Sequence, residues 1–287
     1  MPFLSRNVVY GPPIKMTAFR KVAIGTWRTV GDPSVYSTLE LETAAAHAYL
    51  EKLNQQSSLK ITLTHLLGKC VAETIRRHPE MNSLLRFGKL YSRKHVDIFF
   101  QVASDTQGND LSGSTVRKAE DKTVFDFAQI MQKQVSEIRT KGDPAYRKMK
   151  NTMKMIPGWL AGFMINLSGF IMYTLNIWTP LLGTPRDPFG SIMITNIGSL
   201  GLDSAFVPLV PYSRVPCLIA MGAVKDLPIV KNGKIEIASI LKLAVTIDHR
   251  VIDGMHASHL AKTLRKVFEN PEQELGGVTH QTQASNM

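Results

Sequence analysis

The region from Ser191 to Asp248 constrains the fold most, because it contains several β-type runs and one strong turn signal. Asn232-Gly233 lies between two apolar runs, as in two-residue hairpin turns. An antiparallel pair is therefore expected late in the chain. The expected strands are Ser191–Thr195, Pro216–Val224, Ile229–Ile237 and Ile240–Asp248, with the turn at Lys231-Asn232-Gly233-Lys234.

Helical patterns flank this region. Thr62 to Arg77 places apolar residues at helical spacing and stops at His78-Pro79, which predicts a buried helix. The earlier and later elements expected are strands over Val35–Glu42 and His95–Ser104 and helices over Ala44–Leu53, Thr123–Ile138 and His256–Glu269. No long linker divides the chain, so the mixture predicts an α/β fold in a single domain.

Composition limits the class of protein and of partner. A hydrophobic fraction of 44% over 287 residues is enough for a globular core. The net charge of +11 suggests an anionic partner, without choosing among a phosphate-bearing cofactor, a membrane surface and nucleic acid. Cys70 and Cys217 lie in apolar runs, which predicts reduced core residues, and Met1 to Met16 lacks a secretory signal. A cytoplasmic protein is expected.

The segment from Met155 to Pro185 contains 31 consecutive residues without a charge. It exceeds the roughly 20 apolar residues that span a bilayer, but Pro, Gly and Asn residues interrupt it. A basic cluster between Arg139 and Lys154 precedes it, so the region 139–185 could rest on an anionic membrane. Alternatively it packs in an oligomer or lines an acyl-chain tunnel, and helices apolar on all sides favour packing in protein.

Asp248-His249-Arg250-Val251-Ile252-Asp253-Gly254 carries the strongest chemical signal. His249 follows a β run, and its imidazole could act as a base if Asp253 orients it. The alternative is a structural histidine at a strand end, which the pattern alone favours. His256 and His259 add ligand-type side chains, but the strand-to-helix junction gives little support for convergence, so no metal site is expected.

A second segment, Gly190 to Gly201, ends a β run in a hydroxyl, an amide and glycines. Thr195 and Asn196 could donate hydrogen bonds to an oxyanion. A strand that simply enters a glycine turn explains the spacing equally well.

Together the two segments resemble the catalytic domain of the 2-oxo acid dehydrogenase acyltransferases (E2 components), whose hallmark is His-x-x-x-Asp-Gly. That family shares its fold with chloramphenicol acetyltransferase. The likeness extends over residues 16–272 through Arg20–Ile24, Lys60–Asn82, Lys89–Ser104, Phe189–Gly201 and Arg214–Gly222. It implies an α/β two-layer sandwich, with a mixed sheet covered by helices, over residues 1–272, followed by a polar tail over 273–287.

The resemblance also implies the roles of individual residues. His249 matches the general base, Asp253 the acid that keeps the site in order, and Thr195 the hydroxyl that binds the oxyanion. The supporting positions are Arg20, which pairs with the acid in related enzymes, and Asn196, Gly198 and Gly254. The implied reaction is direct transfer of an acyl group between coenzyme A and a thiol or alcohol. The implied assembly is a homotrimer, or a higher assembly of trimers, with the site at the subunit interface.

The chain departs from the family in three places. The likeness begins near the N-terminus, so no lipoyl or subunit-binding domain and no covalent lipoyl group are expected, and a separate carrier protein or a small acceptor would be needed. Gly108 to Val116 is more polar than the family's strand, and the uncharged segment is more apolar. The alternative function is a catalytically idle trimer that serves as a scaffold or membrane-surface binder. Nucleic-acid binding is not expected, since no such motif occurs.

Overall fold

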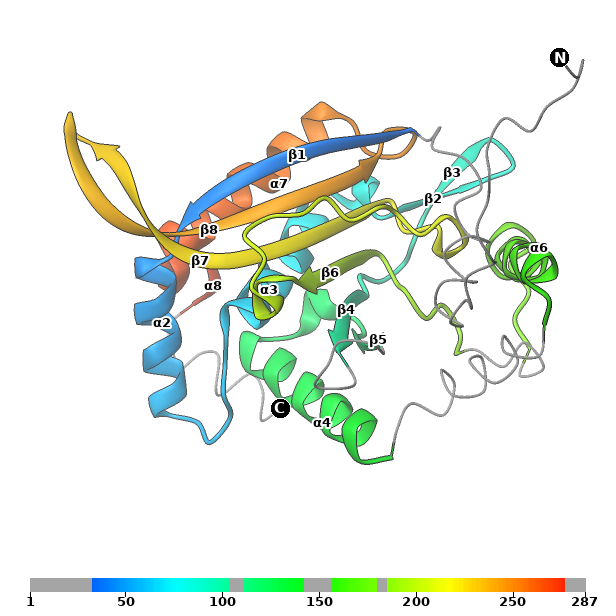
Figure 1. Cartoon of the computed structure of the whole chain (residues 1–287), viewed down its shortest axis with the longest axis horizontal. Coiled ribbons are helices and arrows are strands. Elements are labelled where there is room, and N and C mark those ends of the chain that lie inside the picture. Colours follow the sequence, from blue (N-terminus) through cyan, green and yellow to red (C-terminus); the bar gives the residue numbers. More distant parts are fainter. Residues whose placement is uncertain (1–32, 104–110, 142–155, 180–184, 277–287) are drawn as a thin grey trace, which may run out of the picture.

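The computed structural model describes residues 33–103, 111–141, 156–179 and 185–276, and it shows a mixed sheet packed against a layer of helices (Figure 1). The strands are β1 (Ser34–Glu42), β2 (Ser83–Arg86), β3 (Lys89–Ser92), β4 (Ile98–Ala103), β5 (Leu111–Val116), β6 (Ile192–Asn196), β7 (Cys217–Lys231) and β8 (Lys234–Asp248). The α-helices are α2 (Ala44–Gln55), α3 (Leu63–Arg77), α4 (Val124–Lys141), α6 (Gly158–Gly169), α7 (Gly254–Glu269) and α8 (Pro271–Leu275). Three short turns matter below: the π-helical η3 (Phe170–Thr174), η5 (Gly198–Leu200) and η6 (Pro211–Ser213).

The main sheet has the strand order β1-β8-β7-β6-β4-β5. β4, β6 and β7 run parallel, whereas β8 is antiparallel to both β1 and β7, and β5 is antiparallel to β4. The β7–β8 hairpin turns at Asn232 and Gly233, and both have the positive φ that a type I′ turn requires. β2 and β3 form a separate two-stranded hairpin.

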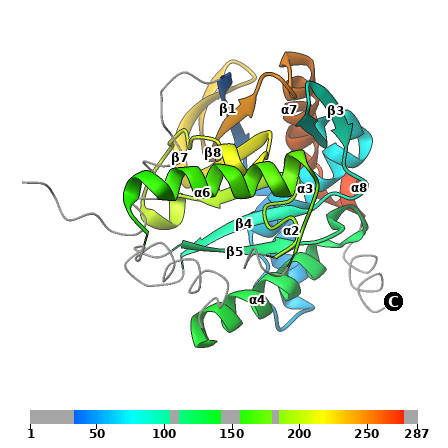
Figure 2. The same ribbon diagram turned by 90° about the vertical axis from the view of Figure 1, so that its right-hand side faces the viewer.

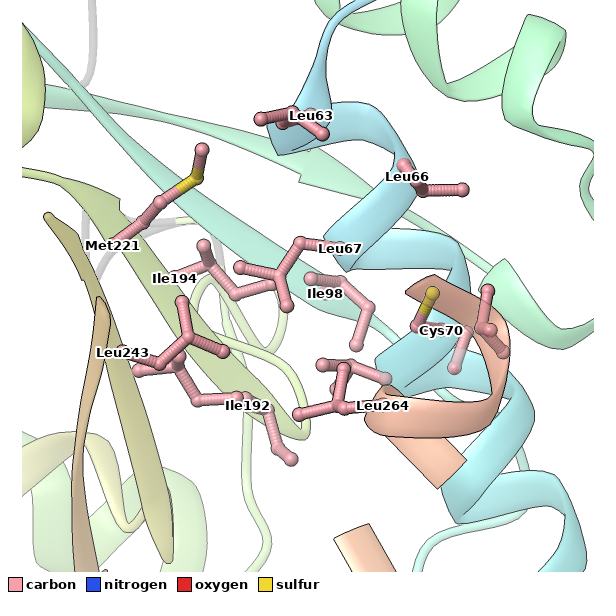
Figure 3. Packing of buried hydrophobic residues seen from close by; sticks show 14 of the residues in the cluster. Leu63, Leu66, Leu67, Cys70, Ile98, Ile192, Ile194, Met221, Leu243 and Leu264 are labelled. Atoms are coloured by element: carbon pink, nitrogen blue, oxygen red, sulfur yellow. The ribbon is translucent and has the colours of Figure 1, made fainter. Parts of the chain in front are cut away.

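The main core lies between the sheet and α3 and α7, as Figure 3 shows. Alternate residues of the central strands, such as Ile192 and Ile194, point to this face, where they meet Leu67 of α3 and Leu264 of α7. Cys70 and Cys217 are buried and free, as expected, and burial raises the pKa of the Cys217 thiol to about 12.

The opposite face of the sheet is covered by the segment that follows η5. Met193 and Leu218 pack there with Val207 and Leu209, while Ala220 and Ala244 form a second small cluster with Val207. The central strands are therefore buried on both faces, which explains their nearly continuous apolar sequences.

The N-terminus of α3 is fixed by a capping box in which the Thr62 backbone N–H donates to Nδ1 of His65, 3.0 Å away. Burial lowers the pKa of the His65 imidazole to about 4. The folded chain therefore keeps His65 neutral at pH values where the imidazole of the unfolded chain, with a pKa near 6.5, takes up a proton.

We expect the free energy of unfolding to fall as the pH is lowered from 6.5 towards 4, by at most about 3 kcal/mol from this group. His65→Gln keeps an acceptor at the third helical position and removes the titration, so its stability should change less over that window. Urea unfolding at a series of pH values and one protein concentration measures the difference. Identical pH profiles for the two proteins would show that His65 is not the group responsible.

The structure confirms most predicted elements and corrects others. The predicted strand Ile229–Ile237 is wrong, because it straddles the hairpin turn. The predicted strands Pro216–Val224 and Ile240–Asp248 are present but too short, because β7 and β8 each continue to that turn. The described part of the polar Gly108–Val116 stretch is strand β5, paired with β4. The β2–β3 hairpin was not predicted. Helix α8 carries the described fold to Leu275, which is buried in the main core, three residues beyond 272.

The uncharged segment forms α6 and η3 at the periphery of the fold, where α6 lies in front of the sheet in Figure 2. Within the described residues, no helix has both the length and the apolar character needed to cross a bilayer. α6 packs on η6, and a Cβ atom on Gly169 would lie 3.1 Å from Tyr212.

Candidate active site

His249 lies in a tight turn directly after β8. Its backbone N–H donates to the Pro33 carbonyl at 3.0 Å, and the Asp248 carbonyl accepts from Val251 and Ile252, both at 2.9 Å. Val251 and Ile252 are buried in the main core. These hydrogen bonds and the buried Val251 and Ile252 thus anchor the turn, while the His249 side chain is exposed in the single chain.

Asp248, the acid that precedes His249 in the sequence, forms an ion pair with Arg250. Arg250 donates to both oxygens of Asp248, from Nε at 2.9 Å and from Nη2 at 2.7 Å. This two-point ion pair holds the turn closed beneath His249. Arg214, half-buried nearby, has a pKa lowered by burial and then by the like charge of Arg250.

Asp253 begins helix α7. Its Oδ1 accepts from the backbone N–H groups of Met255 at 2.9 Å and His256 at 3.1 Å, and Nδ1 of His256 accepts from the Asp253 backbone N–H at 3.2 Å. The pKa of Asp253 is lowered, chiefly by the hydrogen bond from the His256 backbone, with smaller contributions from the His256 and His249 imidazoles. The carboxylate is therefore an N-cap that stays ionised beside His249.

That His256 takes part in the capping box of α7 was not predicted from the sequence. The imidazole was weighed only as a metal ligand, but its Nδ1 lies 2.9 Å from Oδ1 of Asp253 and completes the capping box. An Asp followed three residues later by a side chain that can accept a hydrogen bond is the signal that would have found it. His259 instead stacks on His78, with ring centroids 3.9 Å apart.

Thr195 sits near the C-terminal end of β6, paired with Gln101 on one side and Ala220 on the other. Because Ile194 faces the helices, Thr195 faces the opposite side of the sheet, near Ala220 and Ala244. It is partly buried.

The supporting residues of this turn have structural partners. Nδ2 of Asn196 donates to Oγ1 of Thr64 at 3.1 Å, and its Oδ1 accepts from the Ser199 N–H at 3.1 Å. A Cβ atom on Gly198 would lie 2.6 Å from the Gly222 backbone, so this position needs glycine for a close approach. A Cβ atom on Gly254 would meet no atom within 4 Å.

A single chain does not bring His249 and Thr195 together. Thr195 pairs with Ala220 and Ala220 with Ala244, so His249 lies five residues further along β8 and two strands away. At about 3.3 Å per residue and 4.8 Å per strand, the separation is roughly 19 Å. The two residues lie at opposite ends of the sheet along the strand direction, because β6 and β8 run in opposite directions. Arg20 lies outside the described residues.

Across the described parts of the chain, no cluster of three or more His, Cys, Asp or Glu side chains has the arrangement of a metal site. The exposed imidazole, the ionised acid beside it and the hydroxyl on β6 are instead the groups of acid–base and oxyanion chemistry.

Comparison with known proteins identifies the family of this chain. The family model for the catalytic domain of 2-oxoacid dehydrogenase acyltransferases matches residues 14–150 and 189–275. The chain belongs to this family, which confirms the resemblance inferred from the sequence.

One relative is the dihydrolipoyllysine-residue succinyltransferase component of the 2-oxoglutarate dehydrogenase complex of Haemophilus influenzae. It is 26% identical over 223 residues, which make up 78% of this chain and 44% of the relative. The chain thus spans about half the length of the curated relatives that it matches.

Solved structures show the same fold. The cubic core of a pyruvate dehydrogenase multienzyme complex superposes with a TM-score of 0.66 at 17% identity, covering 96% of this chain and 99% of that one. Chloramphenicol acetyltransferase gives a TM-score of 0.50 at 15% identity, covering 88% and 96%. The expected two-layer α/β fold is confirmed.

Proposed function

We propose that this protein is a coenzyme-A-dependent acyltransferase that moves an acyl group between coenzyme A and a thiol acceptor. The observation that carries the proposal is the turn at His249, where an exposed imidazole lies beside the ionised, helix-capping carboxylate of Asp253. Family membership and the name of the Haemophilus relative support the same class of reaction.

The proposed reaction proceeds by direct transfer. His249 takes the proton from the acceptor thiol, and the sulfur attacks the thioester carbonyl of acyl-CoA. The Thr195 hydroxyl donates to the oxyanion that develops. When the intermediate collapses, the bond from the carbonyl carbon to the coenzyme A sulfur breaks, and His249 returns the proton to that sulfur. The half-buried Arg214 supplies positive charge near the His249 turn for the phosphates of coenzyme A, since Arg250 is paired with Asp248.

The same geometry favours a homotrimer. Since Thr195 and His249 are roughly 19 Å apart in one chain, a complete site requires His249 of one copy to meet Thr195 of another. Closed cyclic symmetry would build an identical site at each interface, and three copies are the arrangement that the resemblance implies. A lipoyl group on a separate carrier protein is the proposed physiological acceptor.

The function is tested by following coenzyme A release from acetyl-CoA and succinyl-CoA with free dihydrolipoamide as acceptor. Acceptor-dependent release that saturates with both substrates is the expected result. If no acyl-CoA and no dithiol or alcohol acceptor gave release, the enzyme proposal would fail, and the idle trimeric scaffold would become the better account.

The two roles of Asp253 can be separated with two substitutions. Asp253→Ala removes the cap and should lower the midpoint of thermal unfolding by about 2 °C or more, whereas Asp253→Asn caps almost as well and should change the midpoint little. Both should lower the rate of acyl transfer if the carboxylate charge steadies the His249 imidazolium. Thermal unfolding and the coenzyme A assay are measured on the same samples, and full activity in Asp253→Asn would limit the acid to capping.

A further inference from the structure

Helix α6 has an unusual distribution of side-chain size between its two faces. Its buried face consists of small and medium residues, with Ala161, Ile165 and Gly169 packed towards η6. Its outward face carries large apolar side chains: Phe163 is 61% exposed, and Leu167 is also exposed. A helix that only covered the protein would place its large apolar residues inward, so this face is shaped for contact with another apolar phase.

The β2–β3 hairpin supplies a second exposed apolar group beside this helix. Phe87 at its turn is 67% exposed, and Tyr91 is also exposed. Arg86 joins the two elements, because its Nε donates to the Thr174 carbonyl at 2.5 Å and its Nη2 to the Leu175 carbonyl at 3.4 Å. We define the apolar platform as six exposed apolar side chains of the hairpin, α6, η3 and the residues just after η3: Phe87, Tyr91, Phe163, Leu167, Phe170 and Ile177.

The described charges around the apolar platform are mostly basic, and the acidic Asp187, which interacts with Tyr173 of η3, is paired with Arg93. From Ser83 to Lys94 the chain has four basic residues and no acidic one, and Lys89 and Lys94 are exposed. Apolar and aromatic side chains rimmed by cations match a surface that is apolar inside and anionic outside.

The apolar platform is not explained by the family's chemistry. The family model passes from residue 150 to residue 189, so α6 and η3 fall entirely in the unmatched stretch. His249 and Thr195 both lie in the matched parts. A segment outside the family match, with large apolar side chains turned outward, calls for an occupant other than the acyl transfer machinery.

We propose that the apolar platform docks on the surface of a membrane that contains anionic phospholipids. α6 would lie in the plane of the interface with Phe163 and Phe87 in the boundary between headgroups and acyl chains. The cationic rim selects a bilayer over a second copy of this chain, because a second copy would bring the same basic residues together.

The experiment is flotation of the full-length protein with vesicles of phosphatidylcholine containing about one third phosphatidylserine, compared with phosphatidylcholine alone. No substrate is present, so the outcome is independent of whether acyl transfer is found. Wild type should bind the anionic vesicles more tightly, and added salt should weaken the binding. The Phe163→Ser/Phe87→Ser variant should lose about 100-fold in affinity, roughly tenfold for each aromatic side chain removed from the interface.

Ile235→Ser is the matched control. Ile235 is 78% exposed on the β7–β8 hairpin, at the end of the molecule opposite α6 (Figure 1). Its substitution should leave vesicle affinity within about twofold of wild type. Light scattering reports the oligomeric state of each variant. The proposal is overturned if wild type does not float with anionic vesicles, if the double variant floats equally well, or if that variant changes only the oligomeric state.

Discussion

Replacing His249 with alanine is expected to reduce acyl transfer from acyl-CoA to dihydrolipoamide by about 100-fold or more. Without the imidazole, no described group beside the turn can take the thiol proton, since Asp248 is paired with Arg250 and Asp253 caps α7. The side chain is exposed, so its removal leaves the anchored turn and the core intact. The loss should appear in kcat, because the base acts in the chemical step.

A second exposed histidine provides the control for this substitution. His47 lies on α2 and is also exposed, so His47→Ala makes the same chemical change away from the turn and should keep wild-type activity. Far-ultraviolet circular dichroism and light scattering on all three proteins would exclude a change of fold or assembly. A His249→Ala protein that retains wild-type kcat would remove His249 from the mechanism, whatever its position suggests.

Two inactive variants are expected to restore activity when they assemble together. His249→Ala lacks the base, and Thr195→Ala lacks the oxyanion donor, yet the residues lie at opposite ends of the sheet along the strand direction. If each site takes His249 from one copy and Thr195 from the next, random mixing of equal amounts leaves about one quarter of the sites with both groups. A trimer purified through tags on both variants has one complete interface of three, so co-expressed, doubly tagged trimers should show about one third of wild-type activity.

A site built within a single chain predicts a different result. If both groups acted within one chain, every site in the mixed protein would lack one of them, and activity would stay at the level of the single variants. Coexpression of His249→Ala with His47→Ala tests the mixing itself, because half of the sites should then remain active. Both measurements use the same assay and the same tags.

The sequence predicts which helices and strands occur better than it predicts the residues at which they begin and end. α3 and β1 were placed within a residue or so, because apolar spacing and the His78-Pro79 stop define them locally. The length of β7 and β8 was missed, because their outer halves are exposed and alternate weakly, and only pairing across the hairpin holds them as strands. Strand β5 was missed because its side chains are small and polar, and its position depends on pairing with β4.

The candidate site was predicted in its residue types but not in its assembly. The His249 turn follows from local chemistry: a strand end, an acid that caps the next helix and a glycine. The distance from His249 to Thr195 depends on the sheet register and on the direction of β8, and neither can be inferred from the two sequence motifs alone. The role of His256 in the capping box likewise depends on where α7 begins, and the predicted helix begins two residues later than α7 does.

The connection between α4 and β6 has a consequence for how this protein could have diverged. β6 lies between β4 and β7, parallel to both, so the chain must travel outside the sheet before it can enter β6. An added stretch there lengthens the path without shifting the register that sets Thr195 opposite Ala220. The stretch 151–188 occupies this connection and lies outside the family match. An insertion in this connection would thus give an acyltransferase fold a new surface and leave the spacing of its reacting groups unchanged.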